Sequence, residues 1–266
     1  SNDIPYLAPA SDGGIWITHY HMGIQHYDPR EQTFTNYNWN NVKGLPRRYW
    51  TARDDGQGNL YVGHVLDGLS IIDMKKMILR NFRHDPNDPN SIPGDEVYSI
   101  CIDHNKNVWV GTNKGIALFN PDTQQFTVFR HKKDDDDSLL PGTVMDIKQM
   151  KNGEIWFATS MGGISILNMQ SNTFTDARNI RFRNITVTND EYGLTGPYVR
   201  RLLQDSYGNI WIGNYRDGLD FISYEPSKFN TLRYTVEKQG QIRYKQVWAL
   251  CIDHNGHLWM GGESEL

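Results

Sequence analysis

Apolar and polar positions along this chain repeat in six copies of one pattern. Each copy has an aromatic residue between aliphatic ones, a short polar connection, and a glycine that opens a second apolar run, as in NVWVGTNKGIALF (107–119). Successive aromatic anchors lie 45 to 55 residues apart. A period of this length with strand-like apolar runs predicts the blades of a β-propeller, each blade a small antiparallel sheet. The six anchors are Trp16, Tyr61, Trp109, Trp156, Trp211 and Trp259.

Each blade is predicted to contain four strands. A turn follows the first strand and is built on glycine, or on Lys106 in the third copy. An aspartate before this turn can cap its amides, and glycine supplies the positive φ. The second strand is apolar throughout because both of its faces meet neighbouring blades, so we expect all six anchors to be buried between blades. In four copies the aspartate stands six residues before the anchor, at Asp55, Asp103, Asp205 and Asp253. In the fourth copy Met150 takes its place.

The repeats are predicted to form one domain over residues 1–266, because a blade buries its faces only by stacking on its neighbours. The first copy has four strands of its own, whereas the sixth ends after two strands, at Leu266. About five and a half blades result, fewer than the seven that are common in such rings. The predicted fold class is therefore all-β, a β-propeller of four-stranded antiparallel blades that forms an incomplete ring of a larger propeller.

Composition excludes some classes of partner. The net charge is −4 and lysines and arginines are scattered, so no nucleic-acid-binding surface is indicated. No apolar run reaches the length of a membrane span, no signal peptide is present, and the opening Ser1-Asn2 is typical of a tag remnant on an excised piece. Cys101 and Cys251 occupy equivalent positions three blades apart, too far for a disulfide. Both are expected to be buried, free thiols.

One family resembles these repeats. The consensus D-x-x-G-N-I-W-I-G-T-x-x-G-L-x-x-F/Y-D is similar to the two-component-regulator propeller repeat, and the best copies are residues 97–129 and 199–222. The connection at 82–97 also resembles those between such repeats. The resemblance covers nearly the whole chain, although the first and fourth copies depart from the consensus.

The resemblance implies a function. Such repeats form the extracytoplasmic sensor of hybrid two-component systems in saccharolytic gut bacteria, which detect oligosaccharides released from glycans and signal to polysaccharide-utilisation genes. It implies a periplasmic location, as part of an inner-membrane protein, and an oligosaccharide ligand. It also implies partners in the remaining propeller and β-sandwich modules of a parent that forms a homodimer. The parent would carry a histidine kinase, while this fragment itself would be no enzyme and contact no nucleic acid.

Candidate ligand-binding residues lie in the connections that the packing repeat leaves unconstrained. One position, directly after a recurrent valine in the first strand of a blade, varies in type while its neighbours do not. Aromatic rings stack on the apolar faces of sugars, polar groups meet hydroxyls, and arginines suit an acidic sugar. The candidates are Arg47, Arg48, Trp50, His64, Tyr98, Tyr198, Arg200, Tyr215, Arg216, Asp217 and Trp248.

Simpler interpretations stand beside these candidates. Trp50, Tyr98 and Trp248 can equally fill the space between adjacent first strands. His19 and His21 have metal-compatible spacing but lack a third ligand nearby in the sequence. The aspartate run at 134–137 lacks the glycine and glutamate of a calcium loop and is expected to be a solvated charge run. We therefore expect no metal and no cofactor.

Two other classes of function stay open. A propeller enzyme acting on glycans, a lyase or a hydrolase, would show turnover of a glycan panel, whereas a sensor binds without forming product. Histidines could serve as general bases, but no paired carboxylates or nucleophile elbow accompany them. A protein-interaction scaffold would bind a partner protein and not respond to sugars.

Overall fold

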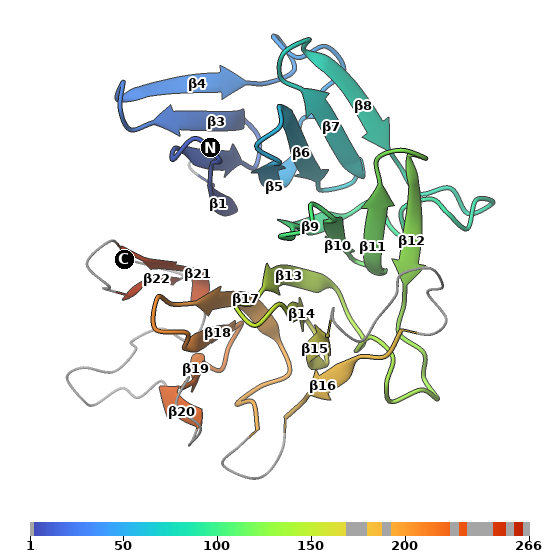
Figure 1. Ribbon diagram of the computed structural model, residues 1–266, viewed down its shortest axis with the longest axis vertical. Coiled ribbons are helices and arrows are strands. Elements are labelled where there is room, and N and C mark those ends of the chain that lie inside the picture. The colour runs from blue at the N-terminus through green and yellow to red at the C-terminus, as the bar shows by residue number, and fades with distance from the viewer. Residues whose placement is uncertain are drawn as a thin grey trace. The chain divides into compact units, whose positions relative to one another are not determined.

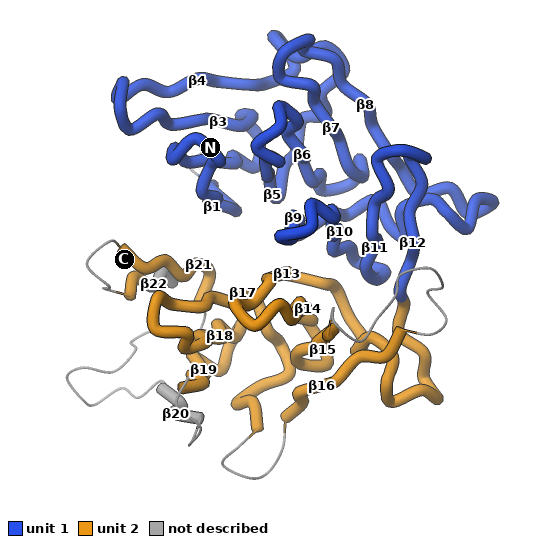
Figure 2. The backbone as a smooth tube through the Cα atoms, in the orientation of Figure 1, with its two compact units in different colours: residues 1–129 blue, residues 130–266 orange. Residues whose placement is uncertain are grey.

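Every secondary-structure element that the computed structural model describes is a β-strand. The chain divides into two compact units, Ser1–Phe129 (unit 1) and Arg130–Leu266 (unit 2), which Figure 2 colours separately. The structure describes residues 3–168, 180–187, 193–223, 229–232, 247–253 and 258–262.

Unit 1 contains three four-stranded antiparallel blades, each with its strands hydrogen-bonded in chain order. Figure 1 shows them in blue to green. The first blade is β1 (Tyr6–Pro9), β2 (Ile15–His19), β3 (Gly23–Asp28) and β4 (Thr33–Tyr37). The second is β5 (Tyr49–Asp54), β6 (Asn59–His64), β7 (Leu69–Asp73) and β8 (Ile78–Phe82). The third is β9 (Val97–Ile102), β10 (Val108–Thr112), β11 (Gly115–Asn120) and β12 (Gln125–Phe129).

Unit 2 contains two further four-stranded blades and a two-stranded sheet. The prediction of four-stranded antiparallel blades is confirmed for five of the six copies, and the sixth shows the two strands expected of it. The fourth blade is β13 (Val144–Gln149), β14 (Ile155–Thr159), β15 (Gly163–Leu167) and β16 (Arg183–Ile185). The fifth is β17 (Val199–Gln204), β18 (Ile210–Asn214), β19 (Leu219–Ile222) and β20 (Phe229–Leu232), and the sixth copy is β21 (Val247–Ile252) and β22 (Leu258–Gly262).

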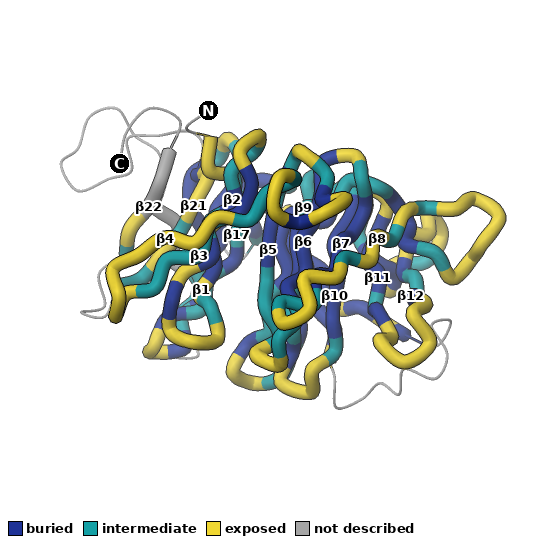
Figure 3. Tube along the Cα trace, turned by 90° about the horizontal axis from the view of Figure 1, so that it is seen from above, coloured by how far each residue is buried: buried dark blue, intermediate teal, exposed yellow. Residues whose placement is uncertain are grey.

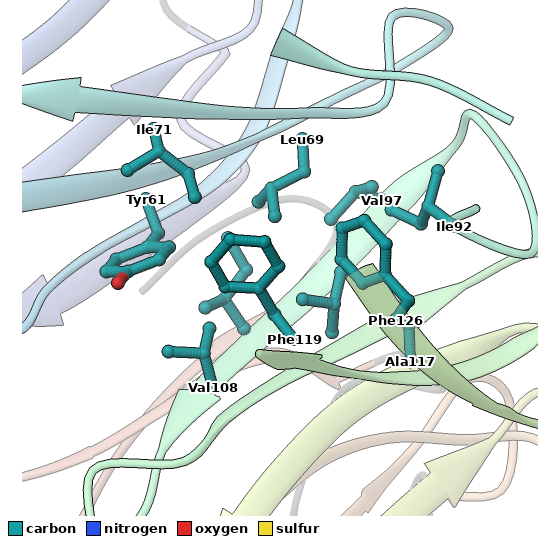
Figure 4. Close-up of a cluster of buried hydrophobic side chains, with 11 residues drawn as sticks. Tyr61, Leu69, Ile71, Ile92, Val97, Val108, Ala117, Phe119 and Phe126 are labelled. Atoms are coloured by element: carbon teal, nitrogen blue, oxygen red, sulfur yellow. The ribbon is translucent and has the colours of Figure 1, made fainter. Parts of the chain in front are cut away.

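The core of unit 1 lies between adjacent blades. Figure 4 shows Tyr61 and Ile71 of the second blade facing Val108 and Phe119 of the third, within one buried cluster. Each apolar side chain of this size stabilises the fold by roughly 1.5–3 kcal/mol when it is fully buried. The outer strands differ: Figure 3 shows β4 largely exposed while β6 and β7 are buried, whereas Phe126 of β12 belongs to the buried cluster. Neighbouring blades are therefore held together mainly by their first three strands, including Val97 and Ile100 of β9.

The aromatic anchor of a blade packs on the blade that follows it. Trp16 shares a cluster with Leu60 of the second blade, and Trp156 shares one with Leu202 of the fifth. This one-sided packing predicts that an anchor depends on the next blade for its burial. Trp16, Tyr61, Trp109 and Trp156 are buried, as expected from the sequence.

Burial of the last two anchors was predicted wrongly. Trp211 is half-buried and the Trp259 side chain is 53% exposed. Trp211 belongs to the fifth blade, and only two strands of the copy that follows it are described. Trp259 is in that copy itself, and no blade follows it among the described residues of unit 2. Both exposures follow from the packing of an anchor on the next blade.

The aspartate before each anchor closes the first turn of the blade. In the third blade, Asp103 Oδ1 accepts hydrogen bonds of 2.9 Å from the amides of Asn105 and Asn107, which is the predicted capping. Its Oδ2 accepts the side-chain amide of Asn107 at 2.8 Å and the indole Nε1–H of Trp109 at 3.0 Å. One carboxylate thus joins the turn to the anchor, a link between repeat positions that sequence spacing did not reveal.

The two irregular copies replace this carboxylate with another one. Trp16 Nε1 donates to Oδ2 of Asp54 in the next blade at 2.6 Å, and Trp156 Nε1 donates to Oε2 of Glu154 at 3.1 Å. Burial by itself would raise the pKa of Glu154, but hydrogen bonds from Asn152 and Trp156 outweigh it and the pKa is lowered. The indole therefore keeps an ionised acceptor even where the repeat sequence departs from its consensus.

Lys106 occupies the turn position that is glycine in other blades, and it has a positive φ of 67°. A side chain in this region costs about 1–2 kcal/mol, which glycine does not pay. We expect Lys106→Gly to raise the free energy of unfolding by up to about 1 kcal/mol, because glycine also loses more backbone entropy on folding. Lys43→Gly is the control, since Lys43 is exposed and does not have a positive φ. Urea unfolding of both variants tests this, and an equal loss of stability in both would contradict it.

Both cysteines are free thiols, but their expected burial was wrong. Cys101 in β9 is half-buried and Cys251 in β21 is exposed. Residues of a strand face alternate sides, and these cysteines lie on a side of their strand that described residues cover only in part. The small-hydrophobe interpretation therefore does not hold for Cys251.

Candidate functional site

A β-bulge marks the variable position of every first strand from the second blade onward. In β17, Val199 pairs with Asn214 and Arg201 pairs with Gly213, so Arg200 is the extra residue on its strand. A bulge releases one residue from the regular ladder and re-aims its side chain. This position can therefore change in type without disturbing strand pairing. The bulge residues are Trp50, Tyr98, Met145, Arg200 and Trp248.

In unit 2, Arg200 lies against two aromatic rings. Its guanidinium carbon is 5.0 Å from the ring centre of Tyr215 and 4.8 Å from that of Trp248. The two rings meet edge-on, with centres 6.1 Å apart and planes at 76°. Arg216 adds a second guanidinium, with its carbon 5.4 Å from the Tyr215 ring centre. These contacts bring together four of the residues predicted from the sequence.

A pocket of about 440 Å³ opens beside these residues. The Tyr215 amide donates to the Tyr198 carbonyl at 2.9 Å, which joins the two connections that border the pocket. The Tyr198 side chain is 44% exposed, and that of Trp248 is 41% exposed. We call this the Arg–Tyr pocket. The residues that line it are Ser160, Tyr198, Val199, Arg200, Tyr215 and Arg216.

Three contributors to this region were not among the candidate ligand-binding residues, although Met145 occupies the variable position of its blade. Ser160 and Val199 line the pocket, and Met145 places its sulfur 3.9 Å from the Arg200 guanidinium. Ser160 directly follows the second strand of its blade, as Tyr215 does in the next blade, so its position in the repeat was an available indication. Val199 was taken as packing alone because it belongs to the recurrent valine position.

Asp217 does not line the pocket. Its carboxylate lies against Gly196, where a side chain would collide with it. Asp217 thus packs the connection before β17 onto the connection before β19. Its predicted ligand contact stays a prediction.

In unit 1, two bulge residues stack on each other. The rings of Trp50 and Tyr98 lie 5.1 Å apart at 27°, and Tyr20 meets Trp50 edge-on at 5.3 Å. The Tyr98 hydroxyl donates to Glu96 Oε2 at 2.7 Å. Both Trp50 and Tyr98 are half-buried. These contacts favour the interpretation in which Trp50 and Tyr98 fill the space between adjacent first strands.

His64 is buried completely, so its predicted place on a ligand-binding surface was wrong. Its Nδ1 lies 3.2 Å from the Arg48 carbonyl oxygen and its Nε2 lies 2.8 Å from Ser70 Oγ. Burial lowers the pKa of His64 to about 4, and the hydrogen bond with the Arg48 carbonyl opposes this effect. The imidazole is therefore neutral at physiological pH and ties the end of β6 to its surroundings.

The other two arginines predicted from the sequence lie in unit 1. The Arg47 guanidinium carbon stands 5.1 Å from the ring centre of Trp39, and the Arg47 side chain is exposed. Arg48 is half-buried, and its carbonyl oxygen faces His64. Neither residue belongs to the lining of the Arg–Tyr pocket.

The described residues contain no group of three histidine, cysteine, aspartate or glutamate side chains that could hold a metal ion. His19 Nε2 lies 2.7 Å from Gln25 Oε1 instead. The aspartate run carries ion pairs, with Asp135 3.5 Å from Arg181 and 3.6 Å from Lys132. None of the described segments contains a helix long and apolar enough to cross a membrane.

Comparison with known proteins identifies the repeat. The model of the two component regulator propeller family matches residues 91–114, 193–216 and 241–264, within the third, fifth and sixth copies. The extracellular domain of a B. thetaiotaomicron protein described as a hybrid two component system is 34% identical, with a TM-score of 0.70. The match covers 98% of this chain and 32% of that one. The chain is therefore a β-propeller protein in which three of the six copies match the two component regulator propeller repeat.

Two further matches agree with this. PorZ, a surface component of the type-IX secretion system of Porphyromonas gingivalis, is 17% identical with a TM-score of 0.69, over 98% of this chain and 37% of PorZ, and so supports the fold alone. Histidine kinase P4 of Formosa agariphila is 30% identical over 92 residues, which are 34% of this chain and 7% of the kinase. The chain thus spans about a third of the similar structures and a small part of the curated relative.

Proposed function

We propose that this chain is part of the extracellular ligand-sensing region of a hybrid two-component system. Its ligand is an oligosaccharide derived from a glycan, and binding is passed to a histidine kinase that controls polysaccharide-utilisation genes. The region lies in the periplasm, works with the remaining propeller and β-sandwich modules of its parent, and forms a homodimer there. The observation that carries this proposal is the Arg–Tyr pocket in a chain of this repeat family.

The chemistry of the pocket suits a sugar. Its volume of about 440 Å³ lies within the range of small-molecule sites. Tyr198 and Tyr215 offer ring faces to the C–H patches of a pyranose, and their hydroxyls can exchange hydrogen bonds with sugar hydroxyls. Because the side chains come from a bulge and from two connections, they can vary while the blades stay the same.

Binding rather than turnover is the better match to this lining. Glycoside hydrolysis usually requires two carboxyl groups across the scissile bond, and no aspartate or glutamate is among the described residues that line the pocket. A lyase would need a general base beside a metal or an acidic ligand set. The one histidine among our candidates, His64, is buried and tied into the fold of unit 1.

Calorimetric titration of the chain with oligosaccharides released from plant, algal and host glycans tests this function. Once a binding fraction is found, Tyr215→Ala is expected to cost roughly 1–3 kcal/mol of binding free energy, because a stacking surface is lost. Tyr207→Ala is the matched control, since Tyr207 is on the same blade, is 76% exposed and does not line the pocket. Release of product would support an enzyme. Equal affinity of both variants would exclude this pocket, and no response to any sugar would contradict the function.

A further inference from the structure

The charge of the Arg–Tyr pocket narrows the class of ligand. Two of its six lining residues are arginines, and no acidic side chain stands among the described residues that line it. This local excess of positive charge contrasts with the chain as a whole, whose net charge is −4. The guanidinium groups of Arg200 and Arg216 both lie near the Tyr215 ring and repel each other. An anion bound in the pocket would offset this repulsion.

Some other exposed arginines of the chain form ion pairs with aspartate or glutamate, whereas others, such as Arg47, have none with a described residue. Arg83 lies 3.6 Å from Asp67 and 3.5 Å from Asp95, and Arg183 lies 3.2 Å from Glu154. Arg216 makes no such ion pair with any described residue. Asp217 is its neighbour in sequence, but that carboxylate is placed against Gly196. Arg216 therefore places an exposed positive charge at the pocket, and no carboxylate of a described residue forms an ion pair with it.

The fold does not require arginine at position 216. Two residues before the glycine that opens the third strand, the other blades carry residues of several types: His21, Leu66, Asn113 and Met161. Arginine occurs there in the fifth blade alone among the five copies with a described third strand. The position thus varies freely within the repeat, which is what a specificity-determining residue needs.

Arg200 is held in a fixed orientation by its surroundings. Its guanidinium carbon lies 5.0 Å from the ring centre of Tyr215 and 4.8 Å from that of Trp248, and its Nη1 lies 3.9 Å from the Met145 sulfur. An arginine has five N–H donors in its plane, so one that contacts aromatic rings can still form paired hydrogen bonds with a carboxylate or sulfate. Because the rings already restrict the side chain, less conformational entropy is lost when an anion binds.

We infer that the Arg–Tyr pocket binds an anionic sugar, one that carries a carboxylate or a sulfate group on its ring. This rests on the proposed function and adds the chemical class of its ligand. Arg200 and Arg216 pair with the anionic group, while the tyrosine rings contact the body of the sugar. Arg216 sets the preference for acidic over neutral sugars.

Matched pairs of sugars separate this inference from the proposed function. The probes are digalacturonate against galactobiose, cellobiouronate against cellobiose, and 6-sulfated against unmodified N-acetylglucosamine, with sodium sulfate as an anion that is not a sugar. At least one acidic sugar is expected to bind about 10-fold or more tightly than its neutral partner. This preference should shrink as NaCl rises from about 50 mM to about 500 mM, because screening weakens exposed charge pairs.

Variants of Arg216 assign the preference to that residue. Arg216→Leu, which introduces the residue type of the second blade, is expected to weaken binding of the acidic sugar about 10-fold or more and leave neutral sugars unchanged. Arg216→Lys should retain part of the affinity. Arg181→Leu is the matched control, as an exposed arginine that does not line the pocket. Melting temperatures of all three confirm that the fold is kept.

Each outcome bears on one of the two proposals. Equal or tighter binding of neutral sugars overturns the anionic class and leaves the sensor function standing. Binding of sulfate without any sugar supports an anion site and overturns the sugar-sensing function. An unchanged preference in Arg216→Leu removes Arg216 from recognition, and no binding by any probe contradicts both proposals.

Discussion

Gly68→Ala is expected to lower the free energy of unfolding by roughly 2–5 kcal/mol, the sum of a backbone and a steric penalty. Gly68 directly precedes β7 and has a φ of 71°, which an L residue adopts only at a cost. A Cβ there would collide with the carbonyl oxygen of Phe82. Phe82 ends β8 and pairs with Leu69, so the carbonyl cannot move without opening the sheet.

Gly153→Ala is the matched control for this prediction. Gly153 also has a positive φ, 87°, but no atom lies within 4 Å of where its Cβ would stand. Only the backbone penalty applies, so the loss is expected to be about 1–2 kcal/mol. Urea unfolding followed by tryptophan fluorescence measures both variants. Equal losses would show that the contact with Phe82 is relieved at little cost.

Stability is expected to fall as the pH drops from about 6.5 to about 4, because of His64. In the unfolded chain its pKa is near 6.5, whereas burial lowers it to about 4 in the folded state. Between these values the unfolded chain binds a proton that the folded protein does not, so acid favours unfolding. The contribution of His64 is complete above pH 6.5 and is lost on the way to pH 4. At about 1.4 kcal/mol per pH unit, the loss approaches roughly 3 kcal/mol.

The variant that isolates this effect is His64→Thr. Threonine occupies the equivalent position in the third and fourth blades, as Thr112 and Thr159, where it is also buried. Because aspartates and glutamates titrate alike in both proteins, the difference between the two stability curves reports His64. We expect this difference to change steadily between pH 6.5 and pH 4 and to be constant above. Parallel curves across that range would show that His64 is protonated within the fold.

The bulges explain how one scaffold carries a variable site. In each first strand, the residue before the bulge is buried, as Val97 and Val199 are, and strand pairing resumes after it. The residue at the bulge is released from this regularity. Arginine in the fifth blade and tryptophan in the sixth can therefore meet beside Tyr215 while the blades themselves stay alike.

Local chemistry let the sequence determine the blades by itself. Apolar second strands, aspartate caps and turn glycines act within about ten residues, so each copy shows its own strands and turns. The same pattern predicted the variable position that holds Arg200 and the loop residues Tyr198, Tyr215 and Arg216. Even Lys106 was placed correctly at a turn glycine position, because spacing alone fixes where the turn falls.

Contacts between strands and blades decided the rest. The sequence places His64 in a loop, but the residue ends β6, its side chain hydrogen-bonds to Ser70 on the adjacent strand β7, and it is buried. Trp211 and Trp259 match the buried anchors in pattern, yet their burial depends on the next blade. The bulge at Arg200 and the turn of Asp217 toward Gly196 arise from strand register and loop packing, which involve residues 12 to 21 positions apart. A repeated sequence pattern shows which strands and turns each segment forms. The exposure and direction of a side chain depend on the residues that pack against that segment in the folded chain.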